Sequence, residues 1–434
     1  MKNGRSVVSL AHRDRIPETP AEYTKESIEI IKEMLVEAIG PLGGLRKFVE
    51  PGHKVVIKPN VVWTFKPETA LNTDPRVVEA LIELIKDQVP EVGEISIFEA
   101  PAAAWQAPIS TLDCYEVAGI ANVARRLNVR LVDGEREEST PVKATGATVQ
   151  SSFDVAKTLR EADCIIAVPK LKTHTQTVMT GAVKIMLGAL KGYDKRKFHA
   201  EGDLAQKLVD IHRAIRPDLV VIDAIWVLQG QGPISLFPED LLPNLNLLIA
   251  SEDCVAADAV ASAIMGLEPF EVETTRIGHH QGIGVGLLEN IDVRGASIEK
   301  VKRPFKRASS DLTCVYPNIA VYMHGSCKGC AHTIRHGLDK LTAEGVLKKI
   351  SEPINIVLGF KTSLPRGLDP QRTLVIGDCT ADHKEDGAYF FPGCPHLPSI
   401  YTVAETIRAI VDKGKPPDFS YLPLDLQPVK TTGK

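Results

Sequence analysis

Short apolar runs that alternate with stretches of helical periodicity constrain the fold of this chain more than any other feature. Between two such runs, residues 76–87 place apolar side chains at helical spacing, and Asp74 before Pro75 is a natural helix cap. Helices are also expected over residues 119–127 and 155–161, and strands over residues 54–57, 95–98, 129–132, 164–168 and 219–222. Strands that alternate with helices indicate an α/β fold with a mainly parallel sheet.

The pattern is interrupted at residues 301–307 and then starts again. This segment, VKRPFKR, is basic and contains a proline, and we predict that it is a linker. Beyond it we expect strands at residues 319–322, 354–358 and 374–376, and helices at residues 332–349 and 403–412. A chain of 434 residues is long enough for two or three domains. We therefore predict a larger α/β domain over residues 1–300 and a smaller α/β domain over residues 308–434.

A cationic stretch follows the apolar run at residues 164–168. Lys170, Lys172 and His174 should lie at or beyond the carboxyl end of that strand, where ligands bind in α/β sheets. Thr180 and Gly181 then precede a short helical run that carries Lys184. Free backbone amides at a helix N-terminus, flanked by lysines and a histidine, favour an anion such as a carboxylate or a phosphate. His174 and Lys184 are the candidate catalytic residues, with His174 as the acid or base.

Other charged residues are expected at the same edge or in solvent. Lys58 and Asn60 end the first clear strand, so we expect them, with Lys170 and Lys172, to bind and orient the substrate. Asp223 follows another strand and should lie nearby. The run Lys195, Arg196 and Lys197 is expected to be a solvated charge run, which is the usual reading of such a run.

Four of the eight cysteines fall in the last quarter of the chain, with the spacing C-x2-C-x48-C-x14-C: Cys327, Cys330, Cys379 and Cys394. Four thiolates suit either a 4Fe–4S cluster or a tetrahedral zinc ion. Structural zinc sites usually have two C-x2-C pairs, and the second pair here is split, which favours the cluster. A zinc site remains open, in which a histidine could replace one thiolate: His324, His332, His336, His383 or His396. A redox-active C-x-x-C with two unrelated thiols is the third reading.

The other cysteines carry less information. Cys164 and Cys254 lie in apolar runs and are expected to be small core residues. Cys114 and Cys314 receive no assignment.

Charge and hydropathy exclude several classes of protein. The 51 Lys and Arg against 55 Asp and Glu leave a net charge of −4, which argues against a nucleic-acid-binding protein. No apolar run reaches the roughly 18 residues that a membrane span needs. The first residues lack the apolar segment of a secretory signal, so we expect a cytoplasmic protein.

Five motifs in order resemble one known family: KPN at 58–60, TDP at 73–75, KLKTH at 170–174, TGAVK at 180–184 and GP at 232–233. They resemble the family catalogued as domain of unknown function 362 (DUF362), over roughly residues 50–290. Several members of that family carry iron–sulfur ligands, and the family has no agreed activity. The resemblance therefore implies an architecture and a site rather than a reaction.

The motif order is also similar, at the level of the fold, to the nickel-pincer lactate racemase family. By position, Lys184 would match the lysine that carries the pincer cofactor, and His174 would match a catalytic histidine. The chain departs from that pattern at Ala182 and Val183, which stand where the family has two glycines, and it lacks the family's early pair of histidines. Nickel is therefore not expected here.

Together these features predict an iron–sulfur protein, most readily an enzyme (an oxidoreductase or lyase) that acts on a small anionic substrate with redox chemistry. A ferredoxin-type protein is the expected redox partner. Two alternatives stay open at this point. One is a non-catalytic electron carrier or cluster-delivery protein, and the other is a zinc-stabilised hydrolase or lyase.

Overall fold

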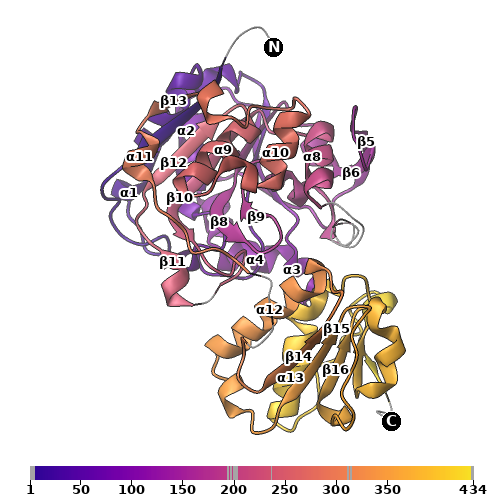
Figure 1. Ribbon diagram of the computed structural model, residues 1–434. Coiled ribbons are helices and arrows are strands. Elements are labelled where there is room, and N and C mark those ends of the chain that lie inside the picture. Colours follow the sequence, from indigo (N-terminus) through magenta and orange to yellow (C-terminus); the bar gives the residue numbers. More distant parts are fainter. Residues whose placement is uncertain are drawn as a thin grey trace.

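The computed structural model describes residues 5–192, 195, 198, 204–235, 237–309, 312 and 315–431. Two sheets organise these residues, one of 11 strands and one of five. The part built on the first sheet, residues 5–301, is called the large lobe below, and the part built on the second, residues 315–431, the small lobe. Figure 1 shows the small lobe, in orange and yellow, beneath the large one.

The large sheet is mainly parallel, which confirms the predicted fold class. Five neighbouring strands run parallel, and β12 lies antiparallel between two others. The main path has the order β13 (Ile291–Gly295), β1 (Ser6–His12), β12 (Leu247–Ser251), β10 (Leu219–Leu228), β7 (Cys164–Val168), β2 (Lys54–Pro59), β3 (Glu94–Glu99) and β4 (Arg130–Asp133). The two-residue β11 (Leu241–Leu242) pairs with β10, and β5 (Ser139–Lys143) and β6 (Ser152–Ala156) form a separate hairpin.

Helices cover both faces of this sheet, because its buried strands carry apolar residues on both sides. In β2, Val55 and Ile57 pack in one core and Val56 in the other. The first core contains residues of α1 (Lys25–Ile39), α2 (Pro75–Gln88), α4 (Thr111–Val117) and α5 (Ile120–Leu127). The second contains residues of α8 (Leu204–Ala214), α9 (Cys254–Ile264) and α10 (Glu273–His280).

The small lobe repeats this architecture at a smaller size. Its sheet has four parallel strands and an antiparallel edge strand: β14 (Ile319–Met323), β15 (Ile354–Leu358), β16 (Thr373–Ile376), β17 (Tyr389–Phe391) and β18 (Val429–Lys430). Its core includes residues of two helices, α12 (Lys328–Ala343) and α13 (Thr402–Val411). Helix α12 lies where the two lobes meet (Figure 1).

Several predicted elements differ from the observed ones. The helix cap at Asp74 is confirmed, since its carboxylate accepts a hydrogen bond from the Arg76 amide at 2.9 Å. The helix predicted at residues 155–161 is confirmed only for the short α6 (Lys157–Arg160), because Val155 and Ala156 end strand β6. Helix α12 begins four residues before its predicted start, with Cys327 at its N-cap.

The KLKTH motif is itself a strand rather than a loop beyond one. It forms β8 (Lys170–His174), which pairs with β10 and with β9 (Val178–Thr180). A strand alternates its side chains, so Lys170, Lys172 and His174 share one face, and Leu171 packs in the core on the other.

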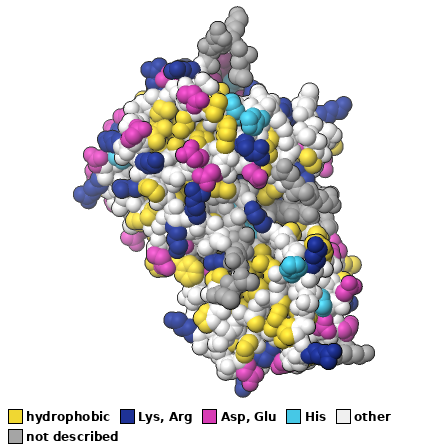
Figure 2. All heavy atoms as spheres, in the orientation of Figure 1, with side chains coloured by type: hydrophobic (Ala, Val, Ile, Leu, Met, Phe, Trp, Pro, Cys, Tyr) yellow, Lys and Arg dark blue, Asp and Glu magenta, His cyan; other side chains and the backbone are white. Residues whose placement is uncertain are grey.

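The surface carries both signs of charge. On the face shown in Figure 2, Lys and Arg side chains intermingle with Asp and Glu side chains over both lobes. Within the described part of the chain, no helix combines the length and the apolar character needed to cross a membrane.

Candidate functional site

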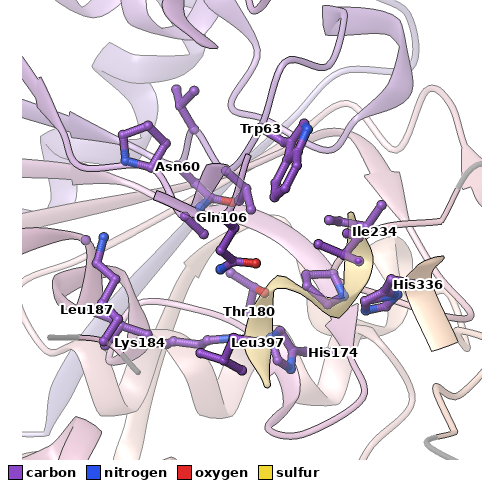
Figure 3. Close-up of a pocket in the computed structure, with 18 of the residues that line it drawn as sticks. Asn60, Trp63, Gln106, His174, Thr180, Lys184, Leu187, Ile234, His336 and Leu397 are labelled. Carbon is purple, nitrogen blue, oxygen red and sulfur yellow. The ribbon is translucent and has the colours of Figure 1, made fainter. Parts of the chain in front are cut away.

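A cavity of about 160 Å³ lies between the two lobes. The large lobe contributes β8, the loop after β2 and the short 3₁₀ helix η4 (Lys184–Ala189), and the small lobe contributes α12 and η11 (Leu397–Ile400). Figure 3 shows Asn60, Lys184 and His336 around it. A cavity of roughly 150 Å³ in another protein holds benzene, so this one has room for a small molecule.

Lys172 reaches the cavity from β8 and is fully buried, with 0 % of its surface exposed. Its ammonium donates to the Leu71 carbonyl oxygen at 2.5 Å, and among the described residues no carboxylate forms an ion pair with it. Burial, and then repulsion from Lys170, lowers the pKa of Lys172 to about 7. A buried lysine without a counter-ion favours the binding of an anion, because the anion would offset the cost of burying the positive charge.

Lys184 lies beside Lys172 and lines the same cavity. Burial, and then the charge of Lys172, lowers its pKa well below the usual value for lysine. In the described part of the chain it too has no carboxylate within ion-pair distance. The two lysines therefore provide a concentrated positive charge as soon as an anion stabilises their protonated forms.

The backbone amides before Lys184 do not form the predicted anion site. Those of Ala182 and Val183 donate to the carboxylate of Asp258, at 2.6 and 3.0 Å, and Asp258 is 1 % exposed. The expectation of free amides there is wrong, because a buried carboxylate from α9 already occupies them. Asp258 instead holds the loop that precedes Lys184.

Lys58 and Lys170 are directed into ion pairs and are not part of the cavity wall. The Lys58 ammonium lies 2.8 Å from a Glu99 oxygen, and that of Lys170 lies 2.9 Å from an Asp223 oxygen. Asp223 also accepts a hydrogen bond from the Asp74 amide at 2.8 Å. Both pairs lie at the sheet edge, where these residues were expected, and of their four members only Glu99 lines the cavity.

Lys195 differs from its prediction. It is buried, lines the cavity and donates to the Ala100 carbonyl oxygen. The reading of a solvated charge run is thus wrong at this position, because the chain folds back over Lys58 and Glu99 there. Arg196 and Lys197 lie outside the described residues.

Three histidines from the two lobes meet at one end of the cavity. The ring of His174 stacks on that of His332, with ring centres 5.0 Å apart, and His332 contacts His336 edge to face at 4.6 Å. Nδ1 of His174 accepts hydrogen bonds from the amides of Gln176 and Thr177, at 3.1 and 3.3 Å. The ring proton of neutral His174 is therefore on Nε2.

Four buried polar atoms of the cavity wall have no hydrogen-bond partner among the described residues: Asn60 Oδ1, Thr180 Oγ1, and Nδ1 and Nε2 of His336. His336 is 2 % exposed, and burial, followed by the charges of Arg335 and Lys172, lowers its pKa to about 3. It is a neutral imidazole at physiological pH, with one donor and one acceptor nitrogen to satisfy.

The four predicted cysteine ligands converge at the N-terminus of α12. A Cβ atom placed on Gly377 would lie 3.4 Å from the Cys330 sulfur and 3.5 Å from the Cys379 sulfur. Burial raises the pKa of the Cys330 thiol, and the nearby thiols of Cys327, Cys379 and Cys394 raise it further. Cys330 is buried, whereas the other three are exposed at the surface.

This arrangement fits an inorganic group larger than one ion. A single zinc ion needs thiolate sulfurs about 3.8 Å apart, given its bond length and tetrahedral geometry. In the described residues, no three His, Cys, Asp or Glu side chains meet in a way that could hold one metal ion. Gly377 and Gly393 are both at positive φ, and Gly377 lies against the sulfurs of Cys330 and Cys379.

The cavity and the cysteines share a helix. Thr333 lies in the cavity wall one turn after Cys330, and its hydroxyl donates to the Cys330 carbonyl oxygen at 3.1 Å. The amide of His396 donates to the Cys330 sulfur at 3.3 Å, and Leu397, the next residue, lines the cavity. With a rise of about 1.5 Å per residue, Cys330 lies within roughly 10 Å of the cavity residues Thr333 and His336 along the helix.

The remaining histidines and cysteines have structural surroundings. The imidazole of His396 bonds the Pro392 carbonyl and the Thr402 hydroxyl, and that of His383 bonds Asp386. Cys114, Cys164 and Cys254 are buried, whereas Cys314 lies outside the described residues.

Sequence patterns did not predict the small-lobe wall of the cavity. They indicate His332 and His336 only as possible metal ligands. Their i, i+4 spacing on one helix was the available signal, since it places both rings on one face. Glu99 and Asp258 gave no comparable signal.

Three comparisons relate the chain to known proteins. The model of the family "Domain of unknown function (DUF362)" matches residues 55–263, which include β8, η4 and Asp258. A thylakoid-associated protein of Synechocystis sp. is 30% identical over 250 residues, which cover 56% of this chain and 72% of that protein. The lactate racemase apoprotein from Thermoanaerobacterium thermosaccharolyticum is similar over 82% of this chain and 69% of its own, at 10% identity and a TM-score of 0.39. The chain belongs to the DUF362 family.

Proposed function

We propose that this protein is an iron–sulfur enzyme that carries out redox chemistry on a small anion bound between the lobes. One observation carries the proposal: α12 holds Cys330 at its first turn and presents Thr333 and His336 to a cavity. The same cavity contains two lysines that have no carboxylate partner among the described residues. The cysteine site and the anion cavity are then two ends of one functional site.

The cysteine geometry supports a 4Fe–4S cluster rather than zinc. Four thiols converge, three of them at the surface, without the close approach that a single ion needs. When bound, such a cluster would supply or accept single electrons. With four cysteine ligands it is coordinatively saturated, so electron transfer is a better role for it than Lewis-acid chemistry.

The residues of the cavity have distinct proposed roles. Lys172 and Lys184 bind the anion in their protonated forms, and the anion raises the pKa of both lysines again and so restores the protons that burial makes them lose. His174 exchanges a proton through Nε2, because its Nδ1 is held by two backbone amides. Lys58 and Lys170 act from behind, by fixing Glu99 and Asp223 at the sheet edge.

Metal and sulfide analysis tests the cluster. Protein purified without oxygen, or reconstituted with iron and sulfide, should be brown and contain about four iron atoms per chain. Cys330→Ala and Cys379→Ala should lose most of that iron, whereas Cys254→Ala, which changes a buried core thiol, should retain it. A colourless protein with about one zinc per chain would replace this proposal with the zinc-stabilised hydrolase or lyase.

A second candidate is favoured by the exposure of three of the four cysteines. A cluster at the surface could exchange electrons with a ferredoxin-type partner without any small substrate. Thermal unfolding separates the two functions. A cluster reduced by a ferredoxin, in a protein whose Tm no small anion raises, indicates the electron carrier or cluster-delivery protein. Protection by anions indicates the enzyme.

A further inference from the structure

We infer that the ligand of the cavity is a small anion that also carries at least one hydroxyl group. The inference rests on the proposed function for the anionic part, and it names the class of substrate more closely. It is carried by the polar atoms of the cavity wall that the protein leaves without hydrogen bonds.

Buried polar atoms without partners are rare in folded proteins, because each costs the free energy of removing it from water. Four of them line this one cavity: Asn60 Oδ1, Thr180 Oγ1 and both ring nitrogens of His336. They come from different elements of both lobes, and Figure 3 places Asn60 and His336 on different sides of the cavity. A ligand that fills the space would contact them together.

The chemistry of these atoms specifies what the ligand must offer. The hydroxyl of Thr180 and the N–H of neutral His336 can donate to the oxygens of an anion, as Lys172 and Lys184 can. Asn60 Oδ1 and the second ring nitrogen of His336 can only accept. A carboxylate or a fully ionised phosphate has no hydrogen to give them, so the anionic group alone leaves them unsatisfied.

The missing donor must be a neutral one. An ammonium group could donate hydrogen bonds, but Lys172, Lys184 and Lys195 line the same cavity, and Glu99, the one acidic side chain among its described lining residues, is already paired with Lys58. Like charges at such short range in a buried site are strongly unfavourable. A hydroxyl group has no charge and can donate to an acceptor while it accepts from Thr180 or His336. The size of the cavity limits the ligand to a small molecule.

Calorimetric titration of the full-length protein with three-carbon acids tests the inference. Glycerate, propionate and serine share a carboxylate and differ in hydroxyl and ammonium groups. We expect glycerate to bind at least tenfold more tightly than propionate, and serine to bind no better than propionate. Glycerol 1-phosphate and propyl phosphate, compared in the same way, show whether the anionic group is a phosphate or a carboxylate.

Variants locate the preference in the cavity. Thr180→Val and His336→Phe should each reduce the preference for glycerate at least threefold, while His280→Phe, which changes an exposed histidine of α10, should leave it unchanged. Thr180→Val conserves shape, so it remains informative if His336→Phe does not fold. If the phosphates bind instead of the carboxylates, the affinities of glycerol 1-phosphate and propyl phosphate are compared in the same variants.

The outcomes separate the two proposals. Equal affinity for the hydroxylated and plain anions overturns the hydroxyl inference and leaves the anion site intact. Failure of all the acids and phosphates to bind overturns the anion site and the hydroxyl inference together. The proposed cluster is then tested by the metal and sulfide analysis alone.

Discussion

At the scale of single residues, Lys184 is a half-buried lysine in the cavity wall. It lies beside Lys172 without a carboxylate partner in the described residues, and its protonated form is destabilised until an anion arrives. Charge-assisted hydrogen bonds contribute about 1.5–3 kcal/mol each, which corresponds to roughly a 10- to 100-fold effect on affinity.

Lys184→Ala should therefore weaken the binding of a small anion at least tenfold and abolish turnover, with the fold intact. Titration calorimetry with inorganic phosphate or glycerate measures the affinity, and circular dichroism checks the fold. Lys143→Ala, an exposed lysine of β5, is the matched control and should bind normally. An unaffected affinity and rate in Lys184→Ala would remove this lysine from the site.

The pKa of Lys172 makes anion binding depend on pH. Its value of about 7 in the folded protein, against 10.5 ordinarily, means that the lysine is largely neutral above pH 7, and a bound anion restores its proton. We predict that affinity falls as the pH rises above about 7, and that binding near pH 8 takes up protons. Calorimetry in two buffers of different ionisation enthalpy measures the uptake.

The same shift acts on stability. Between about pH 7 and pH 10.5 the unfolded chain binds more protons at this lysine than the folded protein does, so Lys172 makes the free energy of unfolding rise with pH. Lys184, whose pKa is also lowered, has the same sign. In Lys172→Met both the proton uptake and the rise in stability should diminish. Proton uptake equal to that of the unchanged protein would contradict the assignment.

At the scale of elements, η4 owes its position to α9. The carboxylate of Asp258 accepts two backbone amides from the loop that leads into η4, and Gly181 packs directly against it. A Cβ at Gly181 would lie 2.1 Å from an Asp258 oxygen, so only glycine allows this approach. The position of Lys184 thus depends on Asp258, which lies some 70 positions later in the chain.

Asp258→Ala should lower the free energy of unfolding by about 3 kcal/mol, because two buried amides lose their acceptor. Anion affinity should fall as well, since the loop before Lys184 loses its support. Denaturant titration and calorimetry measure the two effects. Asp292→Ala, at a partly exposed position in β13, should change stability by less than about 0.5 kcal/mol. Normal anion binding by Asp258→Ala would show that the loop is held in another way.

At the scale of the molecule, the two lobes create a site that neither has alone. The large lobe supplies the cations, and the small lobe supplies the cysteines and the histidines of α12. Because Cys330 and the cavity residues Thr333 and His336 lie on one helix, within roughly 10 Å of one another along its axis, charge in the cavity should be felt at the cysteines.

A bound anion should therefore lower the reduction potential of the bound cluster, since a nearby negative charge opposes the added electron. A unit charge at about 10 Å gives a shift of tens of millivolts at an effective dielectric constant near 20. Redox titration followed by electron paramagnetic resonance, with and without the anion, measures it. In Lys184→Ala the shift should disappear at the same anion concentration. An unchanged potential under saturating anion would mean that the two sites act separately.

Local patterns in the sequence were sufficient for the α/β class, the cap at Asp74 and the group of four cysteines. Each depends on residue spacing, which follows from the geometry of a strand, a helix turn or a ligand pair. Local patterns also found Lys172, His174 and Lys184, because the polar residues that follow a buried strand emerge at its edge. They placed the start of the helix at 155–161 too early, because pairing with β5 draws Val155 and Ala156 into a strand.

Only the tertiary structure decided which charges face the cavity. Lys58 and Lys170 lie in or directly after buried strands, as Lys172 does. Glu99 pairs with Lys58 and Asp223 pairs with Lys170. Because these partners are distant in the chain, the residues around each lysine do not reveal the pairing. The same holds for His336, which reaches the cavity because the small lobe packs on the large one. Spacing determines which side chains share an edge, whereas the packing of distant segments determines which of them remain without a partner and can bind a ligand.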